Sequence, residues 1–148
     1  MTQLVFTSQI DFIDRWNKEP PSSSVCISIT DRIMSYKPYI DPNWKESLAL
    51  EFFDFDSEKE SEFTNKHAKQ ICEFVDKISS MNLQYIVVHC FAGISRSAAV
   101  ANFISCVMNL PFPDHYMLYN KYVFRTLMSY WNMNYLAKGE ESWNLEKD

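Results

Sequence analysis

The sequence predicts an α/β domain with a central, mostly parallel, twisted sheet of about four to five strands and helices on both faces. Short apolar runs rich in β-branched residues, at 25–30, 47–53 and 85–88, alternate with longer segments of helical character, at 63–79 and 98–108. Strands that are joined through helices run parallel, because a parallel connection needs a long crossover. The chemistry of such a sheet is expected at the carboxyl ends of its strands.

Length and composition limit the possibilities. The chain has 148 residues, 47% of them hydrophobic and 16% aromatic, which fits one globular domain with a sizeable core. We assign residues 1–137 to this domain and 138–148 to an acidic, polar tail that is expected to be poorly ordered. The net charge of −5 makes nucleic acid an unfavourable partner. No apolar run approaches the roughly 20 residues of a membrane span.

Residue usage points to a cytoplasmic protein without a cofactor. The N-terminus lacks the basic and long apolar regions of a signal peptide, and the four cysteines form no C-x-x-C pair, so a reducing compartment is expected. Only two glycines are present, which excludes glycine-rich nucleotide loops. The three histidines have no zinc-site spacing, so no metal is expected.

The elements follow in order. Residues 8–16 place Ile10, Ile13 and Trp16 three apart and predict a short amphipathic helix, and residues 25–30 predict a strand. Residues 33–46 are rich in aromatic and proline residues and are expected to be irregular. Their rings could line a slot for an aromatic phosphoester or cover an edge of the core, and both possibilities stay open.

The sequence patterns after residue 46 predict their elements more clearly. Residues 47–53 predict a strand with Leu48, Leu50 and Phe52 on one face. Residues 63–79 carry an apolar stripe at helical spacing and predict a helix. A last helix is expected over residues 119–132, where its apolar face closes the core.

Residues 85–97 carry the chemistry. A buried strand runs into Cys90, a tight loop follows, and a helix begins near Arg96 and Ser97. Backbone N–H groups and the positive end of the helix dipole then point at the centre of the loop, which suits an anion with three oxygens. A cysteine in that place should be a thiolate at neutral pH.

Each residue type in the loop has a chemical reason. Cys90 is the candidate nucleophile, and Gly93 lets the backbone turn so that the amides face the anion. Arg96 offers a planar fork for two phosphate oxygens. Ser97 can donate a hydrogen bond to the sulfur when it leaves, and His89 is expected to support the loop backbone. These roles predict attack on phosphorus and a phosphocysteine intermediate that water hydrolyses.

The motif His89-Cys90-x-x-Gly93-x-x-Arg96-Ser97 resembles the signature of the cysteine-based protein tyrosine phosphatase superfamily. With its short chain, the protein most resembles the compact dual-specificity branch, which includes phage, viral and bacterial members. The resemblance covers roughly residues 25–131 and implies the phosphotyrosine protein phosphatase fold. It also implies that the following residues bind the substrate phosphate: Phe91, Ala92, Gly93, Ile94, Ser95 and Arg96.

The resemblance also implies a general acid. In this superfamily an aspartate lies on a loop after the strand that precedes the helix leading to the catalytic strand. Here Asp54 and Asp56 are the first carboxylates after that strand, and the run 50–54 resembles the family pattern, which favours Asp54. Asp31, directly after an earlier strand, either supports the pocket or forms a turn. Residues 120–127 resemble the asparagine-led segment of dual-specificity phosphatases.

Three functions follow from these expectations. The first is a phosphatase that acts as a monomer on phosphotyrosine in proteins, with phosphoserine and phosphothreonine as further substrates. The second is a phosphatase for RNA 5′ ends or phosphoinositides, whose family members often carry lysines in or near the loop, whereas the loop here is uncharged apart from Arg96. The third is a phosphate-binding pseudophosphatase, although the cysteine and arginine that such proteins usually lack are both present.

Overall fold

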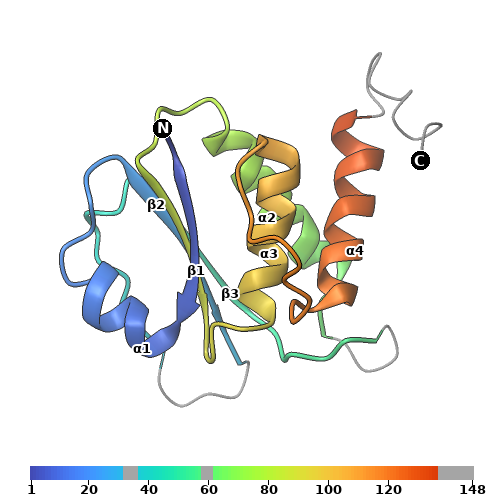
Figure 1. Ribbon diagram of the computed structural model, residues 1–148, viewed down its shortest axis with the longest axis horizontal. Coiled ribbons are helices and arrows are strands. Elements are labelled where there is room, and N and C mark those ends of the chain that lie inside the picture. Colours follow the sequence, from blue (N-terminus) through green and yellow to red (C-terminus); the bar gives the residue numbers. More distant parts are fainter. Residues whose placement is uncertain (32–36, 58–61, 137–148) are drawn as a thin grey trace.

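The computed structural model describes residues 1–31, 37–57 and 62–136. In this part of the chain four strands form one sheet in the order β1-β4-β2-β3, and all neighbouring strands run parallel (Figure 1). The strands are β1 (Gln3–Ser8), β2 (Ser24–Thr30), β3 (Glu46–Glu51) and β4 (Tyr85–Cys90). The predicted parallel sheet is confirmed, and β4 lies inside it between β1 and β2.

Helices cover both faces of the sheet, as predicted (Figure 1). One face carries α1 (Gln9–Asp11), which continues into a π-helical turn, η1 (Phe12–Trp16). The other face carries α2 (Asn65–Ile78) and α3 (Arg96–Met108), and α4 (Lys121–Trp131) packs against both. A second π-helical turn, η2 (Asn132–Leu136), follows α4. None of the helices in the described ranges is long and apolar enough to cross a membrane.

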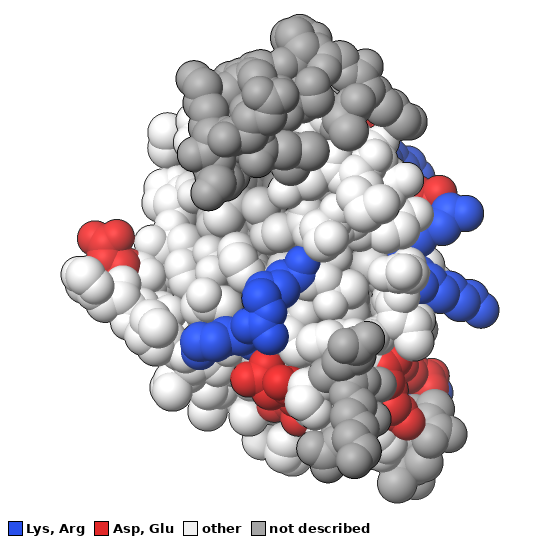
Figure 2. Space-filling model, turned by 90° about the vertical axis from the view of Figure 1, so that its right-hand side faces the viewer, with Lys and Arg blue, Asp and Glu red and all other residues white. Residues whose placement is uncertain are grey.

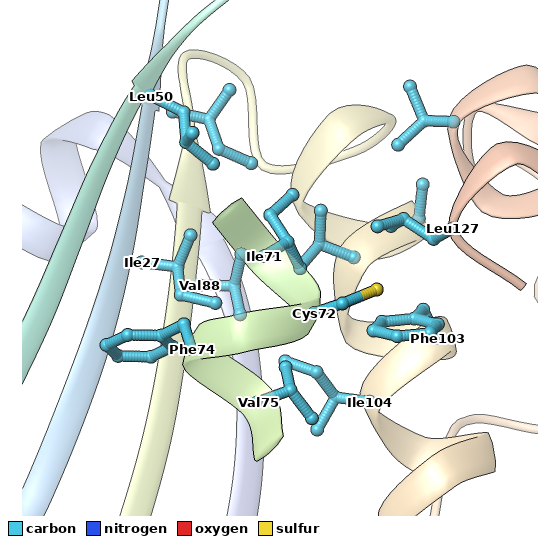
Figure 3. Close-up of a cluster of buried hydrophobic side chains, with 14 of the residues drawn as sticks. Ile27, Leu50, Ile71, Cys72, Phe74, Val75, Val88, Phe103, Ile104 and Leu127 are labelled. Atoms are coloured by element: carbon cyan, nitrogen blue, oxygen red, sulfur yellow. The ribbon is translucent and has the colours of Figure 1, made fainter. Parts of the chain in front are cut away.

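The alternation of side chains along the strands builds two hydrophobic cores. On β4, Ile86 and Val88 point into the larger core beneath α2, α3 and α4, whereas Val87 points into a smaller core with Phe12 and Trp44. Figure 3 shows the larger core, where side chains from the helices meet those of the strands. Because both faces of β4 are buried, the end of this strand is held in a fixed position.

The N-terminal prediction was partly wrong. The sequence did not predict β1, an edge strand, and the helix predicted over residues 8–16 buries Phe12 and Trp16 while Ile10 is 70% exposed. The π-helical turn accounts for this difference, since it adds a residue per turn and shifts the buried face away from a spacing of three. The other expected elements are confirmed within a few residues of their predicted ends.

Two further expectations are resolved only in part. Trp44, from the aromatic segment 33–46, is buried in the smaller core, so this ring covers the core. Residues 32–36, which include Tyr36, and the tail predicted over residues 138–148 lie outside the described residues.

Candidate active site

The carboxyl end of β4 opens into a pocket of about 290 Å³. The chain passes from Cys90 through a tight loop to Ser95 and enters α3 at Arg96, which is the predicted order of strand, loop and helix. Residues from three neighbouring strand ends line the pocket: Asp31, Asp54, Cys90, Phe91, Ala92, Ile94, Ser95 and Arg96. The structure therefore brings Cys90, Arg96 and Asp54 together.

Cys90 lies at the base of this pocket and is only 2% exposed. Its sulfur accepts a hydrogen bond from the backbone N–H of Gly93 at 3.3 Å. Ser97 Oγ lies 3.2 Å from the same sulfur on its buried side. Two polar groups thus contact the sulfur, the N–H of Gly93 and the hydroxyl of Ser97.

Gly93 is required for a reason that the sequence alone did not reveal. Its φ of 74° lies in the left-handed region, and a Cβ there would approach the backbone N of Ser8 to 2.4 Å and the carbonyl carbon of Thr7 to 2.5 Å. The loop therefore packs directly on the end of β1. Because β1 was not predicted, this contact could not be anticipated.

Arg96 is 5% exposed and is held on one side only. One terminal nitrogen donates to Asp31 Oδ1 at 2.6 Å and to the carbonyl oxygen of Phe52 at 2.7 Å. Its buried Nε has no hydrogen-bond partner among the described residues. A buried guanidinium nitrogen without a partner is costly, so Nε is a donor that the described residues leave unsatisfied.

Asp31 is the residue whose role the sequence left open. Its ion pair with Arg96 supports the pocket, as one of the two interpretations expected. The signal in the sequence is its position directly after a buried strand, since such residues meet at one edge of a parallel sheet.

Asp54 and Asp56 have different surroundings. Asp54 lines the pocket, and its Oδ1 accepts hydrogen bonds from Ser95 Oγ at 2.9 Å and from Asn120 Nδ2 at 2.8 Å. Asp56 instead accepts from the backbone N–H of Tyr122 at 2.7 Å, at the start of α4. Both bonds go to Oδ1 of Asp54, the side of the carboxylate that faces Ser95 and Asn120.

His89 lies behind the loop and is fully buried. Its ring stacks on Phe12 with centroids 4.2 Å apart, and its Nε2 lies 2.7 Å from Ser28 Oγ. Burial lowers the pKa of His89 to about 4, with the backbone of Cys90 opposing this shift and the charge of Arg96 adding to it. The imidazole is therefore neutral at pH 7, and its packing on Phe12 supports the end of β4 from behind.

The other three cysteines are less suited than Cys90 to act as a nucleophile in this pocket. Burial raises the pKa of both Cys26 and Cys72 to about 12, so neither thiol ionises at neutral pH. Cys72 packs in the larger core on α2 (Figure 3). Cys106 is exposed on α3, away from the residues that line the pocket.

Asn120 connects the parts of the site and was indicated only by the family resemblance. It is 2% exposed and begins α4, where its side-chain oxygen accepts from the N–H of Val123 at 3.0 Å. Its amide donates to Asp54 and also to the carbonyl oxygen of Phe55 at 2.9 Å. One buried side chain thus links the start of α4 to the segment that carries Asp54.

Comparison with known proteins shows the fold. No family model and no curated protein sequence matches this chain. Its structure is similar to the crystal structure of the human tyrosine phosphatase-like serine/threonine/tyrosine-interacting protein, with a TM-score of 0.54 and 20% identity over 74% of this chain and 77% of that chain. The parallel sheet, the strand-loop-helix around Cys90 and this likeness agree: the chain has a tyrosine phosphatase-like fold.

Proposed function

We propose that the protein is a phosphatase that hydrolyses phosphotyrosine in proteins through a phosphocysteine intermediate on Cys90, with phosphoserine and phosphothreonine as further substrates. The observation that carries this proposal is the buried Nε of Arg96, which lacks a partner among the described residues, in a pocket with the Cys90 sulfur at its base. Asp31 fixes Nη1 of the guanidinium, so that its planar fork is oriented before a phosphate binds.

In the first step the Cys90 thiolate attacks phosphorus, and the bond from phosphorus to the ester oxygen breaks. Asp54, in its protonated form, donates a proton to that oxygen, so that a neutral alcohol or phenol leaves. Arg96 and the loop N–H groups stabilise the charge that develops on the phosphoryl oxygens. The product of this step is a covalent bond between sulfur and phosphorus.

In the second step water replaces sulfur. The Asp54 carboxylate accepts a proton from water, the resulting hydroxide attacks phosphorus, and the sulfur leaves as a thiolate. Ser97 Oγ, 3.2 Å from the sulfur, donates a hydrogen bond to this leaving group. Inorganic phosphate is released, and Cys90 and Asp54 return to their starting forms.

A phosphoprotein fits the pocket better than a polyphosphorylated substrate. Among the described residues that line the pocket, Arg96 is the single cation, and two carboxylates, Asp31 and Asp54, accompany it. Apolar side chains stand at the mouth, where Phe91 is 56% exposed. On the face over α4, Figure 2 shows basic and acidic side chains scattered among uncharged ones rather than a continuous basic surface. RNA 5′ ends and phosphoinositides would favour more positive charge.

Hydrolysis of p-nitrophenyl phosphate with a metal chelator present tests the proposal. Turnover is expected for the wild-type chain and is expected to be absent for Cys90→Ser. A phosphotyrosine peptide and its phosphoserine counterpart then compare the two substrate classes. Tight binding of phosphate without any turnover would instead indicate the pseudophosphatase, and turnover that the chelator abolishes would exclude a mechanism based on Cys90 alone.

A further inference from the structure

Three carbonyl groups of the phosphate loop are held from outside by other parts of the chain. The backbone N–H of Gln9, at the start of α1, donates to the carbonyl oxygen of Phe91 at 3.1 Å. The hydroxyl of Tyr116 donates to the carbonyl oxygen of Ile94 at 2.5 Å. The backbone N–H of Asn120 donates to the carbonyl oxygen of Ser95 at 3.0 Å. The loop is thus fixed by both β1–α1 and the segment between α3 and α4.

These bonds also determine where the loop N–H groups point. Every peptide bond in the described residues is trans, and in a trans peptide the C=O of one residue and the N–H of the next point in opposite directions. A carbonyl that is held outward therefore turns the following N–H inward. By this relation the Tyr116 hydroxyl orients the N–H of Ser95, the residue whose side chain donates to the proposed general acid, Asp54.

The ring of Tyr116 packs against two other aromatic rings. Its ring lies edge-on to Phe6 of β1, with centroids 5.2 Å apart, and edge-on to Phe112 at 6.0 Å. Phe6 and Phe112 stack on each other at 5.5 Å, so the three rings form one cluster beside the loop. Burial, followed by the nearby charge of Cys90, raises the pKa of Tyr116 above its ordinary value, so its hydroxyl keeps its proton and remains a donor.

We infer that Tyr116 is a positioning residue of the phosphate loop, which holds the peptide between Ile94 and Ser95 so that its N–H faces the bound phosphate. The inference rests on the proposed function, because it concerns the same pocket. Of the three outer donors, the Tyr116 hydroxyl is the one that belongs to a side chain. It is therefore the one that a substitution can remove while the backbone stays intact.

The test is Tyr116→Phe, which removes the hydroxyl and keeps the ring cluster. We expect the Kd for inorganic phosphate, measured by titration calorimetry in a Cys90→Ser background, to rise about 3- to 10-fold, the effect of one lost hydrogen bond. In the otherwise wild-type chain, kcat for p-nitrophenyl phosphate should fall by a similar factor. The matched control is Tyr119→Phe in the same segment, whose ring packs on Phe124 and which should change neither quantity.

Different outcomes separate this inference from the proposed function. Unchanged phosphate affinity and kcat in Tyr116→Phe would overturn the inference, and so would a lowered Tm with unchanged affinity, since the hydroxyl would then only stabilise the fold. If the wild-type chain hydrolyses nothing but Tyr116→Phe still weakens phosphate binding, the inference stands and the proposed function fails. Failure of the Cys90→Ser chain to bind phosphate would overturn both.

Discussion

The phosphate loop and the segment that carries Asp54 line the same pocket but are built in opposite ways. The loop lies between a strand and a helix with both ends buried, and Cys90 and Arg96 are 2% and 5% exposed. Residues 52–57, the described part of the segment directly after β3, have no regular structure, and Asp54 and Asp56 are exposed. It is attached through a few polar contacts, chiefly those of Asn120 to Asp54 and Phe55.

This difference fits the two tasks that we propose. A group that binds developing charge works best when its donors are fixed before the reaction, because no energy is then spent on reorienting them. A group that exchanges protons with a leaving group and with water must stay accessible to both. Substitutions in the loop should therefore remove activity for every substrate, whereas the effect of the Asp54 segment should depend on the substrate.

The largest effect is expected for Cys90→Ser. The serine hydroxyl is a far weaker nucleophile, so kcat should fall by on the order of 10⁴-fold or more, the scale seen when a nucleophile is removed. Phosphate binding should survive, because the donors of the loop remain. Turnover of p-nitrophenyl phosphate measures the first effect, and titration with phosphate measures the second. Cys106→Ser, on the exposed side of α3, is the control and should keep full activity.

Asp54→Asn should lower kcat by about 10²-fold, within the range that general acids contribute. The amide keeps the shape and the contacts to Asn120 and Ser95 but cannot donate the proton. The loss should shrink for aryl phosphates with very good leaving groups, and the limb of the pH profile that requires an acid should flatten. A series of aryl phosphates of graded leaving-group pKa measures this dependence.

Asp56→Asn is the matched control for Asp54. Its carboxylate accepts from the N–H of Tyr122 at the start of α4, so its loss should reduce stability slightly and leave the leaving-group dependence unchanged. If Asp56→Asn shows that dependence and Asp54→Asn does not, the general acid is Asp56. If neither variant shows it, the proton comes from another group.

Arg96→Lys should lower kcat by roughly 30-fold or more, which corresponds to about 2 kcal/mol of transition-state stabilisation. This holds if the hydrogen bonds from the guanidinium to two phosphate oxygens strengthen in the transition state. Lysine keeps the charge but cannot contact Asp31, Phe52 and two phosphate oxygens together. Steady-state kinetics separate the possibilities, since a raised KM with unchanged kcat would mean that Arg96 contributes only to ground-state binding. Asp31→Asn, which weakens the ion pair and keeps the guanidinium, should show a smaller loss.

The contrast between the two regions also explains what the sequence could predict. The strand, loop and helix around Cys90 are contiguous, so apolar composition and motif spacing were sufficient to place Cys90, Gly93 and Arg96. The parallel sheet followed from the order of strands and helices. The ends of the elements were less certain, because caps and tertiary contacts decide them.

Contacts between distant segments could not be predicted in the same way. The approach of Gly93 to Ser8, the ion pair from Asp31 to Arg96 and the bond from Tyr116 to Ile94 join residues far apart in sequence. No local pattern encodes such pairs, and β1, on which the first depends, is a partly exposed edge strand with a weak signal. For Asp54 and Asp56, the pattern of residues 50–54 favoured Asp54, but their different hydrogen-bond partners, Asn120 for one and the N–H of Tyr122 for the other, could not be predicted.

The last prediction concerns His89, which lies behind the loop, and is a change in stability with pH rather than in activity. His89 has a pKa of about 4 in the folded chain and about 6.5 when unfolded, so between these values the unfolded chain binds more protons and stability falls as pH falls. The free energy of unfolding should drop by about 2 kcal/mol from this residue between pH 7 and pH 5. Urea titrations at both pH values should show a correspondingly weaker pH dependence for His89→Gln, whose amide can still reach Ser28.

His67→Gln is the control. Burial lowers the pKa of His67 as well, but that side chain is only partly buried, so this substitution should change the pH dependence of stability less than His89→Gln does. Equal pH dependence in the wild-type chain and His89→Gln would mean that His89 accepts a proton within the fold, and the loop would then rest on a charged rather than a neutral imidazole.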